Sequence, residues 1–187
     1  MNSSDAQPRL RHTIYVGDVR ASKEPAEIRT LLGSCVAVCL WDPKTQIGGM
    51  NHFLLPDSSE EAMSFEPTRF GVHAMDVLIG ELMMLGADRR RFVAKVFGAG
   101  HVLGVKETPD SVPQRNMAFV KRFCQDEGFR IVASDLGGKD PRIVVFETDT
   151  GKAKVKHLPR ASVAEKLVEK EAVKREEPPK YGDITLF

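Results

Sequence analysis

The segment that decides the fold runs from residue 28 to residue 56 and reads IRTLLGSCVAVCLWDPKTQIGGMNHFLLP. An apolar run typical of a strand covers residues 36–41, and the Asp-Pro pair at 42–43 marks a turn. Residues 47–55 are typical of a second strand that contains glycines. We therefore expect a β-hairpin here.

The hairpin predicts which side chains face each other. A turn centred between residues 43 and 44 pairs residue 41 with 46, residue 40 with 47, and Cys35 with His52. Opposed residues on one face of a sheet have Cβ atoms about 4.5–5.5 Å apart, so a thiol and an imidazole can share a hydrogen bond there. A longer loop would shift this register by one residue and leave Cys35 and His52 as diagonal neighbours, still within reach.

A cysteine facing a histidine indicates nucleophilic chemistry. An imidazolium lowers the pKa of a neighbouring thiol, and the thiolate is the attacking species. Gly33 allows a sharp turn before Cys35, so the backbone N–H groups of Ser34 and Cys35 are candidate donors to an oxyanion. The structural alternative is that Cys35 is a small buried apolar residue, as free cysteines often are.

Other residues offer competing sites. His101, in the glycine-rich stretch GAGHVLG at 98–104, is a rival base, and that loop is a candidate for the rim of a site. Cys39 lies on the same face of the strand as Cys35 but about 13 Å away, too far for a disulfide or a shared metal. A Cys-Cys-His zinc site finds no fourth ligand at finger-like spacing, so no metal is expected.

The rest of the chain alternates between short strands and two amphipathic helices. We expect a strand at 12–19, a helix at 71–85, a strand at 92–97, a helix at 113–127, strands near 130–134 and 142–147, and a final hairpin ending near 158. Apolar side chains at helical spacing point inward: Met75, Leu78, Ile79, Leu82, Met117, Val120, Phe123 and Cys124. Because strands outnumber helices and do not alternate regularly with them, we predict a layered α+β domain with a mainly antiparallel or mixed sheet packed by the two helices.

The length, net charge and cysteine count limit the functions that this chain can have. A chain of 187 residues fits one domain, here residues 12–160, with a loose arm at 1–11 and a charged helix or tail at 161–187. The net charge of +1 predicts neither nucleic-acid binding nor attraction to anionic membranes. No apolar run is long enough to span a bilayer or direct export, so no membrane insertion is expected. Three cysteines, an odd and low count, favour a reducing cytoplasm.

Several blocks of this sequence resemble the chemoreceptor glutamine deamidase family, CheD. The blocks occur in the family's order: TLLGSCVAVCLWDP at 30–43, IGGMNHFLLP at 47–56, AMDVLIGELMMLGA at 74–87, AKVFGAG at 94–100, RNMAFVKRF at 115–123 and DLGGKDPR at 135–142. The likeness covers about residues 15–158 and includes a cysteine and a histidine 17 positions apart.

The resemblance implies hydrolysis of glutamine side chains to glutamate on methyl-accepting chemotaxis receptors, without a metal or organic cofactor. It assigns the nucleophile to Cys35 and the base to His52. The third catalytic position of the family is a threonine just upstream, for which Thr30 is the nearest candidate. The resemblance also implies a partner, a chemotaxis phosphatase of the CheC type.

Three other functions compete with this interpretation. The first is a related cysteine methylesterase or amidase, because the same thiolate attacks esters more easily than amides. The second is a non-enzymatic chemotaxis adaptor that binds a CheC-type phosphatase or a receptor. The third, a redox sensor that uses Cys35 and Cys39, is disfavoured by their separation along the strand.

Overall fold

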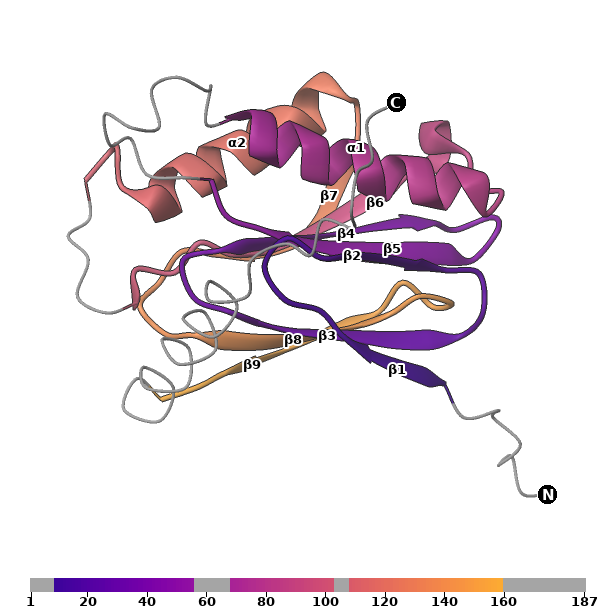
Figure 1. The fold of residues 1–187 in the computed structure, drawn as a ribbon, viewed down its shortest axis with the longest axis horizontal. Coiled ribbons are helices and arrows are strands. Elements are labelled where there is room, and N and C mark those ends of the chain that lie inside the picture. Colours follow the sequence, from indigo (N-terminus) through magenta and orange to yellow (C-terminus); the bar gives the residue numbers. More distant parts are fainter. Residues whose placement is uncertain (1–8, 56–67, 103–107, 160–187) are drawn as a thin grey trace, which may run out of the picture.

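The structure, a computed structural model, describes residues 9–55, 68–102 and 108–159, and these residues form three layers. Two helices cover one face of a five-stranded sheet, and a four-stranded sheet packs against its other face (Figure 1). The predicted α+β domain with a mixed β structure packed by two helices is confirmed, with the strands divided between two sheets. The first eight residues of the predicted arm and all of the predicted tail lie outside the described residues.

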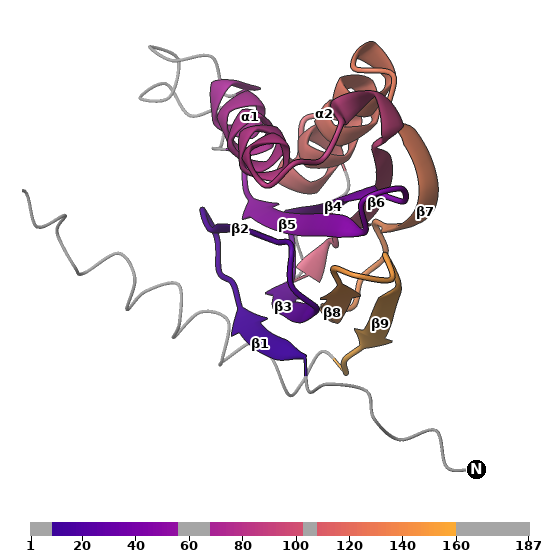
Figure 2. The same ribbon diagram turned by 90° about the vertical axis from the view of Figure 1, so that its right-hand side faces the viewer.

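The five-stranded sheet is the middle layer, with the order β2-β5-β4-β6-β7. Its strands are β2 (Val19–Ser22), β5 (Ile47–Phe53), β4 (Val36–Asp42), β6 (Val93–Gly98) and β7 (Arg130–Leu136). Neighbours are antiparallel except β6 and β7, which are parallel. A parallel pair needs a long crossover, and helix α2 (Val112–Asp126) provides it. Helix α1 (Thr68–Met84) packs beside α2 on the same face (Figure 2).

The four-stranded sheet has the order β1-β3-β8-β9. Its strands are β1 (Leu10–Thr13), β3 (Ala26–Leu32), β8 (Arg142–Glu147) and β9 (Ala153–His157). β1 runs parallel to β3, and the other two pairs are antiparallel. A short 3-10 helix, η2 (Arg89–Arg91), precedes β6.

Strand β4 is buried on both faces, which explains its nearly continuous apolar sequence. Val36, Val38 and Leu40 face the helices and belong to the core cluster between helices and sheet. Ala37 and Cys39 face the other way and belong to the cluster between the two sheets. The described residues therefore form one apolar core on each side of β4.

Both predicted helices are confirmed within a few residues at each end. The four apolar residues expected to point inward from α1 are all buried, and so are Val120 and Cys124 of α2. Met117 and Phe123 pack against the same core while partly exposed. Gly86 and Gly128, with positive φ angles of 104° and 72°, follow the two helices as the sequence predicts for C-terminal caps.

The single strand predicted at 12–19 is wrong, because a turn divides it. The Asp18 N–H donates to the Tyr15 carbonyl at 2.9 Å, and the Asp18 carboxylate accepts from the Tyr15 N–H at 2.8 Å. Gly17 takes a φ of 88°, which residues with a side chain rarely adopt. The chain therefore leaves β1 in one sheet and enters β2 in the other.

The predicted hairpin is confirmed, but its two-residue turn is wrong. Asp42 pairs with Ile47 across a four-residue loop, and the Gln46 N–H donates to the Asp42 carbonyl at 2.9 Å. Gln46 has a φ of 56°, so the loop closes through one left-handed residue rather than a tight primed turn. As a result His52 pairs with Ala37 rather than with Cys35, which lies two residues earlier in the bend before β4.

Candidate active site

Cys35 ends the bend that leads into β4, and 3% of its surface is exposed. It belongs to the buried cluster between the two sheets, together with Ala37 two residues later. His52, which pairs with Ala37 from β5, is also 3% exposed. Diagonal neighbours on one face of a sheet lie about 7–8 Å apart between Cα atoms, a distance that long or aromatic side chains can bridge.

Thr30 comes to His52 from the other sheet. It lies in β3 and is buried, and its Oγ1 is 2.8 Å from Nδ1 of His52. The same hydroxyl donates to the carbonyl of Ile14 at 2.8 Å. The predicted third residue therefore contacts the predicted base across the interface between the two sheets.

These two contacts determine the tautomer of His52. A hydroxyl carries one hydrogen, and the Ile14 carbonyl can only accept it. Nδ1 of His52 must therefore carry a hydrogen and donate it to Thr30 Oγ1. In the neutral ring this leaves the lone pair on Nε2, so Nε2 is the atom that can accept a proton.

The backbone around Cys35 is held by the glycine-rich loop after β6. The Ala99 N–H donates to the Cys35 carbonyl at 2.7 Å, and the Gly100 N–H donates to the Gly33 carbonyl at 2.8 Å. A Cβ on Gly98 would lie 2.1 Å from the Cys35 carbonyl oxygen, closer than any side chain can approach. The loop named from the sequence as a rim candidate thus supports the bend that carries Cys35.

Sequence reasoning missed Asn116, a fully buried residue of α2. Its amide donates to the Ser34 carbonyl at 2.9 Å and accepts from the Leu55 N–H at 2.9 Å. The sequence pattern could have pointed to Asn116, because it lies four residues before Val120 and eight before Cys124. This spacing places a polar residue on the apolar face of the helix.

The rival candidates have other surroundings. His101 is buried, with Nε2 3.3 Å from Ser111 Oγ at the start of α2. Cys39 lies in the core between the sheets, where burial raises the pKa of its thiol well above the usual range. In the part of the chain that the structure describes, no three His, Cys, Asp or Glu side chains gather as metal ligands would.

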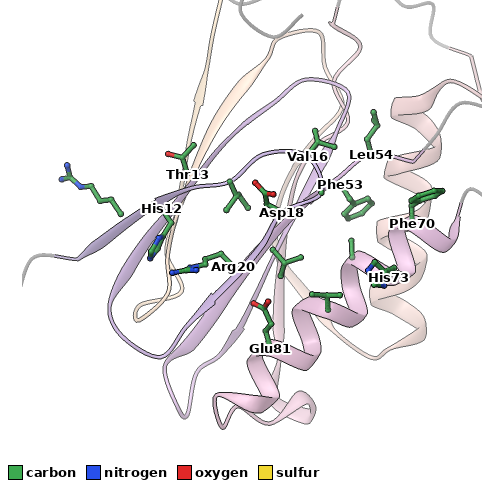
Figure 3. Close-up of a pocket in the computed structure, with 16 residues that line it drawn as sticks. His12, Thr13, Val16, Asp18, Arg20, Phe53, Leu54, Phe70, His73 and Glu81 are labelled. Atoms are coloured by element: carbon green, nitrogen blue, oxygen red, sulfur yellow. The ribbon is translucent and has the colours of Figure 1, made fainter. Parts of the chain in front are cut away.

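A groove of about 730 Å³ lies between α1 and the strands β1 and β2 (Figure 3). Val16, Leu54 and Phe70 line it at one end, and Arg20 and Glu81 at the other. Ile14, Val16 and Leu54 also pack in the cluster that contains Cys35. The apolar end of the groove is therefore continuous with the buried surroundings of the cysteine.

A family model described as CheD chemotactic sensory transduction matches residues 54–157, more than half of the chain. The chain belongs to the CheD family. The CheD match begins just after His52, so it does not itself contain Thr30, Cys35 or His52.

Curated CheD relatives align over a longer stretch. A protein of Stenotrophomonas maltophilia named probable chemoreceptor glutamine deamidase CheD is 44% identical over 86% of this chain and 80% of its own length. A relative from Chromobacterium violaceum, named probable chemoreceptor glutamine deamidase CheD 2, is 42% identical over 93% of this chain and 88% of its own length. That alignment leaves about 13 residues of this CheD chain outside it, so it spans positions 30, 35 and 52. Among the described residues, neither helix has both the length and the apolar character to cross a bilayer.

Proposed function

We propose that this protein hydrolyses glutamine side chains of chemoreceptors to glutamate and releases ammonia. The observation that carries the proposal is the family: relatives 42–44% identical over most of the chain bear the name of this activity. The contact between Thr30 and His52, on the side of the five-stranded sheet where Cys35 packs with Ala37, supports a thiol mechanism.

The proposed reaction has two stages. His52 Nε2 takes the proton of the Cys35 thiol, and the sulfur attacks the carboxamide carbon of the substrate glutamine. The carbonyl oxygen becomes an oxyanion, for which the N–H groups of Ser34 and Cys35 are the proposed donors. His52 then returns the proton to the leaving nitrogen, ammonia departs, and a thioester remains.

Water completes the cycle. His52 removes a proton from the water that attacks the thioester, the bond from carbon to sulfur breaks, and the proton returns to the Cys35 sulfur. The product side chain is a carboxylic acid, which releases its remaining proton to solvent and becomes a carboxylate. Thr30 acts through His52, because its hydroxyl keeps the hydrogen on Nδ1 and leaves Nε2 basic in both stages.

Because Cys35 is buried, the substrate must reach it from an adjoining surface. We place the glutamine-bearing receptor segment in the groove of Figure 3, whose apolar end packs against the cluster around Cys35. A segment lying there would bring one side chain to the edge between the two sheets. The CheC-type phosphatase partner and the cytoplasmic location stay predictions of the sequence.

The test uses purified receptor and mass spectrometry of its peptides to follow conversion of amide to acid. Cys35→Ala and His52→Ala should abolish conversion, whereas Cys124→Ala, which removes a distant thiol in α2, should retain it. Thr30→Val should lower kcat about tenfold or more, and Thr30→Ser, which keeps the hydroxyl, should restore most of it. Full activity of Cys35→Ala or His52→Ala would reject these assignments.

The same assay separates the competing functions. Amidated and methyl-esterified receptor are compared in parallel, and a methylesterase would act on the ester alone. An adaptor would bind receptor with or without the Cys35 thiol and convert neither form.

A further inference from the structure

Asn116 holds together the two segments that carry the proposed nucleophile and the proposed base. Its Nδ2 donates to the carbonyl of Ser34, the residue before Cys35, at 2.9 Å. Its Oδ1 accepts from the N–H of Leu55, three residues after His52, at 2.9 Å. One fully buried amide on α2 therefore connects the bend before β4 to the end of β5.

The Ser34 carbonyl is the middle one of three consecutive carbonyls that are each held. Backbone N–H groups of the glycine-rich loop hold the carbonyls of Gly33 and Cys35, at 2.8 and 2.7 Å. The carbonyl between them is held by the Asn116 side chain. The Asn116 side chain therefore binds the carbonyl of the peptide that joins Ser34 to Cys35.

The orientation of that peptide decides where the Cys35 N–H points. In a planar trans peptide the C=O and the following N–H point in opposite directions. The Ser34 carbonyl points toward α2, on the outer face of the five-stranded sheet. The Cys35 N–H therefore points away from α2, toward the side of the sheet on which Thr30 contacts His52.

We propose that Asn116 is a positioning residue that aims the Cys35 N–H at the oxyanion formed during deamidation. This inference rests on the proposed function. The substrate itself has no need to touch Asn116, because the amide acts through the peptide of Ser34 and Cys35. Its removal should lower kcat with little change in KM, since an oxyanion donor acts mainly in the transition state.

The variant Asn116→Asp tests the donor alone. The introduced carboxylate still accepts from the Leu55 N–H, but it faces the Ser34 carbonyl with an acceptor in place of a donor. We expect kcat at pH 7.5 to fall about 100-fold with KM within about twofold of the wild type. The deficit should shrink as the pH is lowered toward 5, because a protonated carboxyl can donate to Ser34 again.

Two measurements distinguish misorientation of the Cys35 N–H from a general loss of packing around α2. Val120→Ala, four residues along the same face of α2, should lower the melting temperature and leave kcat unchanged. Alkylation of Cys35 by iodoacetamide forms no oxyanion, so its rate in Asn116→Asp should stay within about threefold of the wild type. Asn116→Ser, which lacks the reach of the amide, repeats the comparison if the carboxylate prevents folding.

The possible results distinguish a failure of the proposed function from a failure of the role of Asn116 alone. A wild-type protein that converts no receptor glutamine overturns the proposed function, and this inference with it. Wild-type activity together with an unchanged kcat in Asn116→Asp, or in Asn116→Ser where only that variant folds, overturns the inference alone. An equal fall in kcat in Val120→Ala would also overturn the inference. The same holds if the rate of Cys35 alkylation in Asn116→Asp falls as much as kcat does.

Discussion

The three cysteines occupy different chemical surroundings. Cys39 and Cys124 lie within apolar cores, where burial disfavours the thiolate. It raises the pKa of the Cys39 thiol beyond the usual range and that of Cys124 to about 11. Cys35 shares the core between the two sheets with Cys39, but it lies in a bend whose carbonyls are hydrogen-bonded, beside the face that carries His52. The three thiols should therefore differ in their reactivity, each according to its surroundings.

Iodoacetamide at pH 8 should therefore modify Cys35 first. A thiol with a pKa near 11 is thiolate in only about one part per thousand at that pH, so Cys124 should react at least tenfold more slowly, and Cys39 more slowly still. Peptide mass spectrometry over time measures the three rates. His52→Ala should slow modification of Cys35 alone. Equal rates at Cys35 and Cys124 would contradict an activated nucleophile.

At the scale of elements, Asp42 fixes the loop that sets the register of β4 on β5. Its carboxylate accepts from the N–H groups of Lys44 and Asp88, both at 3.0 Å, and from Nε of Arg91 at 2.9 Å. The Arg91 guanidinium, followed by these backbone donors, holds the pKa of Asp42 far below its ordinary range. One side chain thus joins the hairpin loop to η2.

Asp42→Asn should destabilise the protein by about 2–3 kcal/mol at pH 7, because the contacts to a charged group are lost. A depressed pKa contributes stability above the unfolded value of about 3.9, and that contribution is lost as the pH falls toward the folded pKa. The difference between variant and wild type should therefore shrink between about pH 4 and 2. Urea unfolding across this range measures it. Asp126→Asn, which breaks an exposed pair with Arg122, should change nothing measurable, and a pH-independent difference for Asp42→Asn would contradict the account.

At the scale of the whole molecule, the split between β1 and β2 creates the groove. The two strands are consecutive in sequence but belong to different sheets, so the chain between them crosses from one layer to the other. Helix α1 covers the five-stranded sheet beside this crossing, and the groove lies between them (Figure 3). Phe70, at the start of α1, is 56% exposed on the groove wall, a large apolar surface available to a bound segment.

Phe70→Ser should raise the KM for receptor about tenfold and leave kcat and the melting temperature unchanged. The loss of an apolar contact weakens binding of the segment, and an exposed residue contributes little to folding. Met84→Ser is the matched control, because Met84 is 82% exposed at the other end of α1 and does not line the groove. Steady-state deamidation measures both. An unchanged KM, or an equal change in Met84→Ser, would place the receptor elsewhere.

Local patterns predicted much of this architecture. The helices at 71–85 and 113–127, the strands from 92 onward and the hairpin around residue 43 all follow from spacing and turn residues. The position of Cys35 relative to His52 depended on the length of the hairpin loop. Gln46 adopts a left-handed conformation and the Asp42 carboxylate accepts from the Lys44 N–H, in a loop two residues longer than the predicted turn. Asn116 carried a visible signal, a polar residue on an apolar face, but its partners lie in distant segments.

By itself the sequence determined the family resemblance and the type of most elements. It also determined the hairpin that brings the segments of Cys35 and His52 together. All of these depend on residues that are close together along the chain. Only the tertiary structure decided that β3 faces β5, that Thr30 Oγ1 contacts His52 Nδ1 and that α2 holds the bend before β4. The physical reason is that β4 is apolar on both faces. Periodicity reports that such a strand is buried, whereas the packing of whole layers decides which one covers each side.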